Sequence, residues 1–234
     1  MSLKLAIWDM DGTIVDSREV IQTAMVRAFE TLGLAPPSYE ATRQIVGLGL
    51  SEAVGGLVPD DFDLARLPEL VDAYRKAFVA RRAEPDFKEP LYEGAIETLL
   101  ALQDAGWLIG MATGKSRSGI RAIFDMHPLE PLFDTIWCAD DGPGKPHPYM
   151  VKEAMKSVGA EASQTLIIGD AVHDIRMGRA AGILTHGVSW GFGTADELDA
   201  AGAHHVHHDF EALRTGLDMF NPGPRGLGRA SSQA

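Results

Sequence analysis

The sequence predicts an α/β fold with a Rossmann-like, doubly wound parallel sheet as its core and an α-helical cap domain inserted into that core. Two observations support this prediction. Short apolar runs alternate with amphipathic stretches, which is typical of a parallel sheet covered by helices on both faces. Nearly 100 residues separate Trp8, at the end of the first apolar run, from Leu108, at the start of the second, and one crossover helix needs far fewer.

The apolar runs predict short buried strands, and the segments between them have apolar residues at helical spacing. The predicted strands span residues 3–8, 108–112, 135–138, 165–168 and 183–188. Helical spacing is found in the core at 95–105 and 149–158, and in the long interval at 17–32, 38–46, 50–57 and 64–82. Pro68 predicts a late start for the last of these helices, because proline is tolerated only in a first helical turn.

These elements divide the chain into a core, an insertion and a tail. We expect a Rossmann-like catalytic core at residues 1–15 and 89–220 and a helical cap at 16–88. The segment 221–234 is rich in Gly, Pro and Ser and has no apolar period, so we expect a disordered tail there.

Composition restricts the class of protein. Hydrophobic residues make up 45 % and charged residues 23 % of the chain, as in ordinary globular proteins. The formal net charge of −12 opposes binding to nucleic acid, and no apolar run approaches the roughly 20 residues that cross a bilayer. A single cysteine, Cys138, cannot form an internal disulfide, so we expect a cytoplasmic protein; monomer and homodimer are both open.

Polar residues stand directly after the predicted strands, at the carboxyl ends of the strands, where ligands bind in doubly wound folds. They come from four separate loops: Asp9, Asp11, Gly12 and Thr13, then Thr113 and Gly114, then Lys145 and Pro146, then Gly169, Asp170 and Asp174. Crowding four carboxylates together is costly without a cation, and Mg²⁺ is a hard ion that prefers oxygen ligands. Phosphoryl oxygens could be held at the same place by Thr113, by the backbone amide of Gly114 at the start of a helix, and by Lys145.

This set of motifs resembles the haloacid dehalogenase superfamily of phosphatases over nearly the whole chain. The motifs occur in the family's order: Asp9-Met10-Asp11-Gly12-Thr13, Thr113-Gly114, Lys145-Pro146, and Gly169-Asp170 with Asp174. The helical insertion after the first motif is similar to the cap of the branch that contains phosphoglycolate phosphatases. The segments 112–117 and 144–148 are also similar to that branch.

The resemblance implies a role for each of these residues. Asp9 would be the nucleophile that forms an aspartyl-phosphate, and Asp11 would protonate the leaving alcohol and then activate water. Mg²⁺ would be held by Asp9, the backbone carbonyl of Asp11 and Asp170. Asp174 would contribute to the metal site through water or by orienting Lys145. Thr113, Gly114 and Lys145 would bind the phosphoryl group.

The expected function is therefore a Mg²⁺-dependent phosphatase for a small phosphorylated metabolite, with 2-phosphoglycolate as the best single candidate. Two alternatives remain open. A mutase of the β-phosphoglucomutase type keeps the same aspartate pair and acts on sugar phosphates. A catalytically idle relative would bind phosphate or regulate, although it would not need the intact set Asp9, Asp11, Thr113, Lys145 and Asp170.

Several other features are interpreted as structural. Gly114-Lys115-Ser116 resembles the end of a P-loop, but Ile109 stands where that motif needs glycine. The run 47–49 is interpreted as a turn between helices, with presentation of amides to the substrate as a weaker alternative, and Arg43 as a solvated helix residue. Strand alternation sends neighbouring histidines of 204–208 to opposite faces, so we interpret this run as a solvated last strand or its loop.

Overall fold

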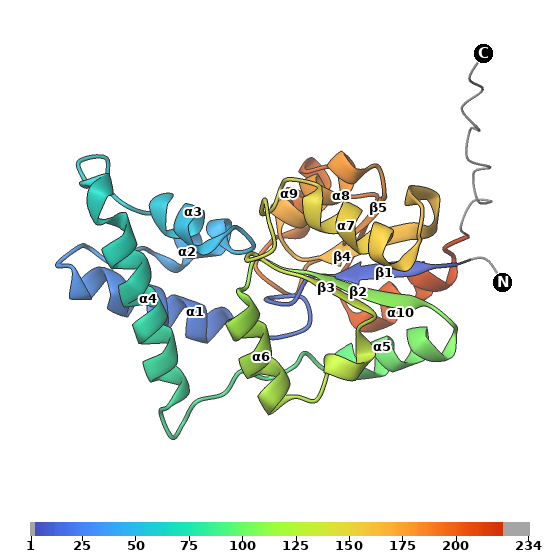
Figure 1. Ribbon diagram of the computed structural model, residues 1–234, viewed down its shortest axis with the longest axis horizontal. Helices are drawn as coiled ribbons and strands as arrows, with labels where there is room; N and C mark the ends of the chain where they lie inside the picture. Colours follow the sequence, from blue (N-terminus) through green and yellow to red (C-terminus); the bar gives the residue numbers. More distant parts are fainter. Residues whose placement is uncertain (1–2, 222–234) are drawn as a thin grey trace, which may run out of the picture.

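The core is one parallel sheet whose strand order confirms the predicted fold class. The computed structural model describes residues 3–221 and places six strands in the order β3-β2-β1-β4-β5-β6, all parallel (Figure 1). The strands are β1 Leu5–Trp8, β2 Leu108–Ala112, β3 Thr135–Trp137, β4 Thr165–Gly169, β5 Leu184–Val188 and β6 His205–His207. The predicted tail, apart from Asn221, lies outside the described residues.

Helices cover both faces of this sheet (Figure 1). On β1, Ala6 and Trp8 pack into one apolar cluster, and Leu5 and Ile7 pack into another on the opposite face. The first cluster includes residues of α5 Ala95–Asp104, α6 Arg117–Met126 and α10 Phe210–Asp218. The second includes residues of α7 Tyr149–Val158 and α8 Val172–Ala181, while α9 Ala195–Ala200 packs against β5 and β6. Because strand side chains alternate, one buried strand contributes to both layers.

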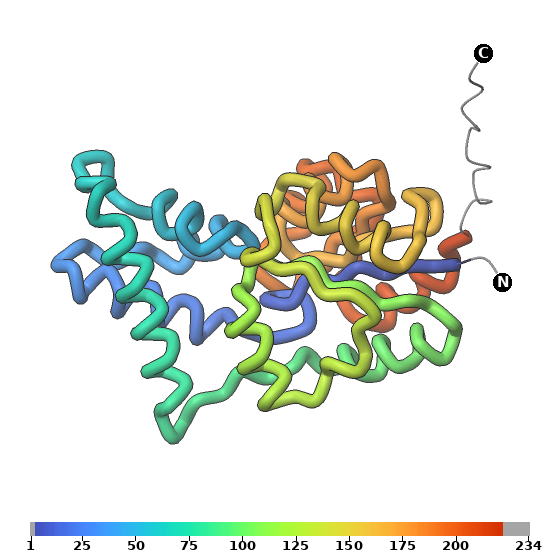
Figure 2. Tube along the Cα trace, viewed as in Figure 1, coloured from blue at the N-terminus to red at the C-terminus, as the bar shows by residue number. Residues whose placement is uncertain are grey.

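Four helices form the insertion between β1 and β2, beside the core in Figures 1 and 2. They are α1 Arg18–Thr31, α2 Tyr39–Ile45, α3 Leu50–Gly55 and α4 Leu67–Arg82, and α4 has Pro68 in its first turn. Met25, Phe29, Val54 and Leu70 give the insertion an apolar core of its own. All four helices fall within residues 16–88, the range that we propose as the cap.

The two linkers to the insertion run side by side. The Asp16 amide donates a hydrogen bond to the Pro90 carbonyl at 2.8 Å, and Val15 forms a β-bridge with Leu91. Between residues 3 and 221, no helix is long and apolar enough to cross a membrane. The chain leaves β1 and β4 toward opposite faces of the sheet, because α5 packs on one face and α8 on the other. A crevice therefore opens between these strands at their carboxyl ends, which face the insertion (Figure 1).

Candidate active site

The loop after β1 turns sharply and places Asp9 and Asp11 at the carboxyl end of the strand. The Asp9 amide donates to the Ile168 carbonyl of β4 at 2.9 Å, which extends the sheet pairing by one residue. Gly12 adopts a φ of +82°, and a side chain at this position would collide with the Asp170 carboxylate. Glycine is therefore required here both for the turn and for the close approach of Asp170.

Asp170 follows β4 and both of its carboxylate oxygens are held. The Thr13 hydroxyl donates to Oδ1 at 2.8 Å, and the Phe192 amide donates to Oδ2 at 2.7 Å. Asp170 is fully buried, so these hydrogen bonds replace water that the carboxylate loses. Thr13 belongs to the first sequence motif, but the sequence assigned it no role.

Lys145 is buried between two carboxylates. Its Nζ lies 2.6 Å from Oδ1 of Asp9 and 2.6 Å from Oδ1 of Asp174, and its side chain is 0 % exposed. Asp174, in the first turn of α8, also accepts a hydrogen bond from the Ala171 amide at 3.1 Å. These contacts fix the Lys145 ammonium next to the Asp9 carboxylate.

Burial dominates the electrostatics of this cluster. It raises the pKa of Asp9 to about 7, although the Lys145 charge opposes the rise. Burial, together with the charges of Asp9 and Asp174, raises the pKa of Asp170 well above its usual range. Burial alone would lower the pKa of Lys145, but the two neighbouring carboxylates raise it above its ordinary value. The Lys145 ammonium therefore stays charged, but its single positive charge does not balance the three carboxylates of Asp9, Asp170 and Asp174.

This shortage of positive charge, with the geometry, fits a metal ion. Asp9, Asp170 and Asp174 each offer a carboxylate oxygen, and these oxygens lie within 4.8 Å of one another. Three buried carboxylates face one ammonium, so a hard cation with oxygen ligands would balance them. The Asp11 side chain points elsewhere: its Oδ1 lies 2.9 Å from the Lys115 ammonium.

The loop after β2 supplies Thr113 and Gly114. Thr113 is buried; its amide donates to the Trp137 carbonyl at 3.1 Å, and its hydroxyl accepts from the Lys115 amide at 3.2 Å. The sequence predicted that Gly114 opens a helix, which is wrong, because α6 begins at Arg117 and the Ser116 hydroxyl caps it. The Gly114 amide thus belongs to the loop rather than to the helix N-terminus.

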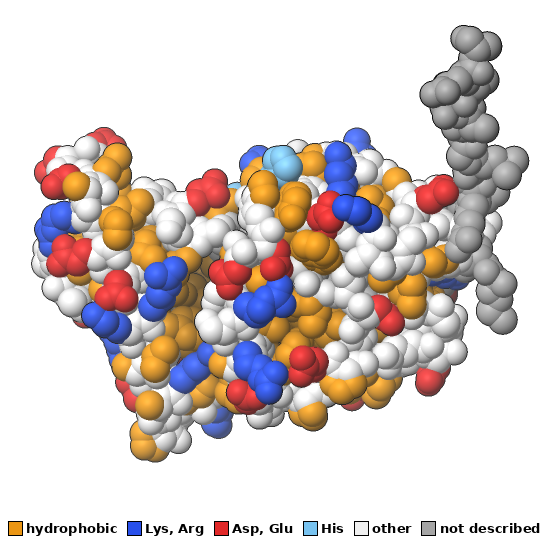
Figure 3. Space-filling view, viewed as in Figure 1, with side chains coloured by type: hydrophobic (Ala, Val, Ile, Leu, Met, Phe, Trp, Pro, Cys, Tyr) orange, Lys and Arg blue, Asp and Glu red, His pale blue; other side chains and the backbone are white. Residues whose placement is uncertain are grey.

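The insertion touches this loop directly. A side chain at Gly114 would collide with the Gly47 carbonyl, so glycine here permits close contact between core and insertion. Gly47, between α2 and α3, has a φ of +97°, as the predicted turn requires, and it also lies against Lys145. Figure 3 shows that the surface is hollowed between the insertion and the core.

Comparison with known proteins identifies the family. The family model for haloacid dehalogenase-like hydrolases matches residues 6–188. The chain belongs to this family. It is 33 % identical to the probable phosphatase IndB of Dickeya dadantii over 84 % of this chain and 86 % of that protein. It is 30 % identical to a phosphoglycolate phosphatase of Rhodospirillum rubrum, over 96 % and 95 % of the two chains.

Two further relatives extend the comparison. The pyrophosphatase PpaX of Bacillus pumilus is 29 % identical to the chain, over 81 % of this chain and 84 % of that protein. The solved structure of a hydrolase from Pseudomonas syringae superimposes with a TM-score of 0.79 at 25 % identity, covering 93 % and 98 % of the two chains. The structural similarity thus includes the insertion as well as the sheet.

One interpretation from the sequence is wrong in this family member: Arg43 is not a solvated helix residue. Its guanidinium, on α2, donates to the Phe192 carbonyl at 3.0 Å and to Glu197 at 2.8 Å, and the side chain is only 13 % exposed. Nε2 of His173, on α8, lies 3.0 Å from the Gln44 carbonyl oxygen of α2. Both contacts join the insertion to the core across long sequence separations, which helical periodicity does not reveal.

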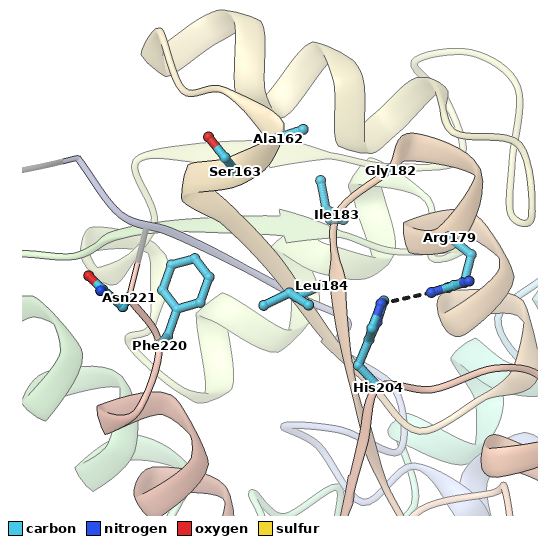
Figure 4. Close-up of a pocket in the computed structure, with 9 residues that line it drawn as sticks. All are labelled: Ala162, Ser163, Arg179, Gly182, Ile183, Leu184, His204, Phe220 and Asn221. Atoms are coloured by element: carbon cyan, nitrogen blue, oxygen red, sulfur yellow. Dashed lines mark hydrogen bonds between the residues drawn. The ribbon is translucent and has the colours of Figure 1, made fainter. Parts of the chain in front are cut away.

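A second hollow lies at the other end of the strands, beside the starts of β4, β5 and β6 (Figure 4). It has a volume of about 430 Å³, and on one side of it Nη1 of Arg179 and Nε2 of His204 are hydrogen-bonded at 2.7 Å. No carboxylate lines it, so it lacks the groups that the family chemistry needs. On the neighbouring strands, His207 pairs with the buried His186 at 2.9 Å, while His205 is exposed.

Proposed function

We propose that the chain is a Mg²⁺-dependent phosphatase for a small phosphorylated metabolite, with 2-phosphoglycolate as the best single candidate. One observation carries the proposal: the buried Asp9 carboxylate contacts Lys145 and belongs to a carboxylate cluster that could hold a metal ion, while Asp11, two residues on, contacts a separate lysine. Two carboxylates held in different surroundings can take different roles in one reaction.

In the proposed reaction, Asp9 attacks phosphorus and the bond to the leaving oxygen breaks, which gives an aspartyl-phosphate. Asp11 acts in its protonated form and donates that proton to the leaving oxygen. It then takes a proton from water, whose oxygen attacks phosphorus, so that inorganic phosphate leaves and Asp9 is restored. Covalent catalysis of this kind divides one difficult displacement into two easier ones.

The other residues position the phosphoryl group. Lys145 and Thr113 would contact its oxygens, the Gly114 amide would add a donor, and Asp174 holds Lys145 in place. Mg²⁺, held by Asp9, the Asp11 carbonyl and Asp170, would supply charge neutralisation on the phosphoryl oxygens. Phosphoryl transfer leaves mainly positioning and charge stabilisation to the protein, which suits this set of residues.

A small substrate is supported by the position of the insertion. The turn at 47–49 lies against Gly114 and Lys145, which leaves little depth for a large leaving group. Relatives of similar length are named as a phosphoglycolate phosphatase and as a pyrophosphatase, and both names denote small substrates.

A panel of phosphate esters tests the proposal. With Mg²⁺ we expect release of inorganic phosphate from 2-phosphoglycolate and from a minority of small esters, and loss of that activity in EDTA. Interconversion of β-glucose 1-phosphate and glucose 6-phosphate, without net phosphate release, would instead indicate a mutase. No turnover of any ester with Mg²⁺ would indicate a catalytically idle protein.

A further inference from the structure

Lys115 has no place in the metal cluster or in the contacts of Lys145, yet it is buried in the same site. It follows Thr113-Gly114, and its side chain is only 9 % exposed. Its ammonium lies 2.9 Å from Oδ1 of Asp11, the carboxylate proposed to protonate the leaving oxygen. In the sequence this residue stood out as part of an apparent P-loop, which Ile109 excludes, and as a member of the segment 112–117.

The insertion encloses this ammonium. The Phe78 ring of α4 lies with its centroid 5.2 Å from Lys115 Nζ, a cation–π contact that favours a charged side chain. Glu89, in the second linker, is fully buried and lies 3.9 Å from the same Nζ. Glu89 also pairs with Arg82 of α4 at 2.7 Å, so its charge is already balanced from the insertion side.

The position of Lys115 relative to the leaving group follows from the role of Asp11. A general acid must lie within hydrogen-bond distance, about 2.6–3.2 Å, of the oxygen that it protonates. Lys115 Nζ contacts the same Asp11 carboxylate, so with Asp11 as the general acid it would lie close to the leaving oxygen and the atoms attached to it. A negative group one or two bonds beyond that oxygen would meet a buried ammonium.

We infer that Lys115 binds an anionic group on the leaving part of the substrate. The enzyme then prefers phosphate compounds whose leaving part carries a carboxylate or a second phosphate over compounds with an uncharged leaving part. This inference rests on the proposed phosphatase function and narrows its substrate class. Lys145 serves the transferring phosphoryl group and Lys115 the leaving group, so the two buried lysines divide the substrate between them.

Two matched esters test this division. 2-Phosphoglycolate and ethyl phosphate are similar in size and differ in the carboxylate of the leaving part. For each we would measure kcat and KM with Mg²⁺ in the native enzyme, Lys115→Met and Lys115→Arg. Lys76→Met is the control, because Lys76 is a lysine of the insertion, in α4, whose side chain is 78 % exposed and whose ammonium pairs with Asp72 at the surface.

In Lys115→Met we expect the ratio of kcat/KM for 2-phosphoglycolate to that for ethyl phosphate to fall about tenfold or more, mainly through KM, because hydrogen bonds to charged groups contribute strongly. Lys115→Arg should restore much of the ratio, and Lys76→Met should leave it unchanged. An equal loss on both esters would overturn the inference, since Lys115 would then act only through Asp11. An unchanged ratio would overturn it as well.

Two further results keep the proposals separate. If Lys115→Met does not fold, as judged by circular dichroism, the native enzyme itself decides: no preference for 2-phosphoglycolate over ethyl phosphate would overturn the inference. If the native enzyme hydrolyses several esters with an uncharged leaving group faster than it hydrolyses 2-phosphoglycolate, the phosphatase proposal stands and the proposed role of Lys115 is rejected. Absence of hydrolysis of any ester would reject the phosphatase function first.

Discussion

At the scale of single residues, Lys145 balances the charge of the buried cluster. It contacts Asp9 and Asp174 at 2.6 Å each, and replacing it with an uncharged residue would leave buried carboxylates without a counterion. Breaking a buried pair in this way typically costs about 3–5 kcal/mol of unfolding free energy. The structural and catalytic demands on this lysine therefore coincide.

We predict that Lys145→Met lowers the unfolding free energy of the metal-free protein by about 3 kcal/mol and lowers kcat by about 10³-fold or more. Urea unfolding in EDTA, and phosphate release with Mg²⁺, measure the two effects. Lys156→Met is the control, because Lys156 pairs with Glu153 on the surface and is 77 % exposed. A variant as stable as the native protein in EDTA would show that the carboxylates need no counterion.

The raised pKa of Asp9 gives a second prediction, on metal affinity. Burial raises this pKa to about 7, so below neutral pH a proton occupies the carboxylate that the metal needs. The affinity for Mg²⁺ should therefore fall about tenfold or more for each pH unit below about 7, and level off above it. Calorimetric titration with Mg²⁺ between pH 5.5 and 8.5 measures this affinity. An affinity that does not change over that pH range would contradict the prediction.

At the scale of elements, local signals located strands β1 to β5 and the four helices of the insertion. The expected helix at 17–32 is α1 Arg18–Thr31, because its apolar spacing is a local feature. The late start expected from Pro68 is also found, since a short 3₁₀ turn precedes α4. The packing of α2 on the core was not predictable, because Arg43 and Glu197 are 154 residues apart.

That packing yields a prediction about the insertion. Arg43 joins α2 to the Phe192 loop and to α9, so Arg43→Ala should weaken the contact between insertion and core. We expect a loss of stability of about 1–2 kcal/mol and a several-fold rise in KM, because closure over the substrate becomes less favourable.

Arg66→Ala is the matched control for this variant. Arg66 is also an arginine of the insertion, but it pairs with Glu69 on the surface and its side chain is 45 % exposed. Exposed pairs of this kind contribute at most about 1 kcal/mol. Kinetics and thermal unfolding of both variants measure the difference, and equal effects would show that the Arg43 contacts do not hold the insertion in place.

At the scale of the whole molecule, the net charge of −12 is compatible with phosphate chemistry because charge is balanced locally. Acidic and basic side chains are interspersed over the face shown in Figure 3. Within the site, Lys145 and Lys115 are both buried and each contacts a different aspartate of the first motif. A protein can thus be acidic overall and still present two ammonium groups to an anionic substrate.

Motif order made most of the site predictable, and packing made the rest unpredictable. Asp9, Lys145 and Asp170 could be placed together from the sequence, because each follows a strand of one parallel sheet. Lys115 could not be assigned, since its contact with Asp11 depends on how Phe78 and Glu89 enclose it. The roles of these residues in catalysis are predictions that kinetics must decide.

The proposed nucleophile is tested most directly by the rate of phosphate release in Asp9→Asn. The native enzyme and the variant would be compared on the best substrate of the ester panel, with saturating Mg²⁺ and with circular dichroism as the check on folding. We expect a folded variant whose rate falls on the order of 10³-fold or more. A folded variant that keeps a rate within tenfold of the native enzyme would contradict the assignment of Asp9.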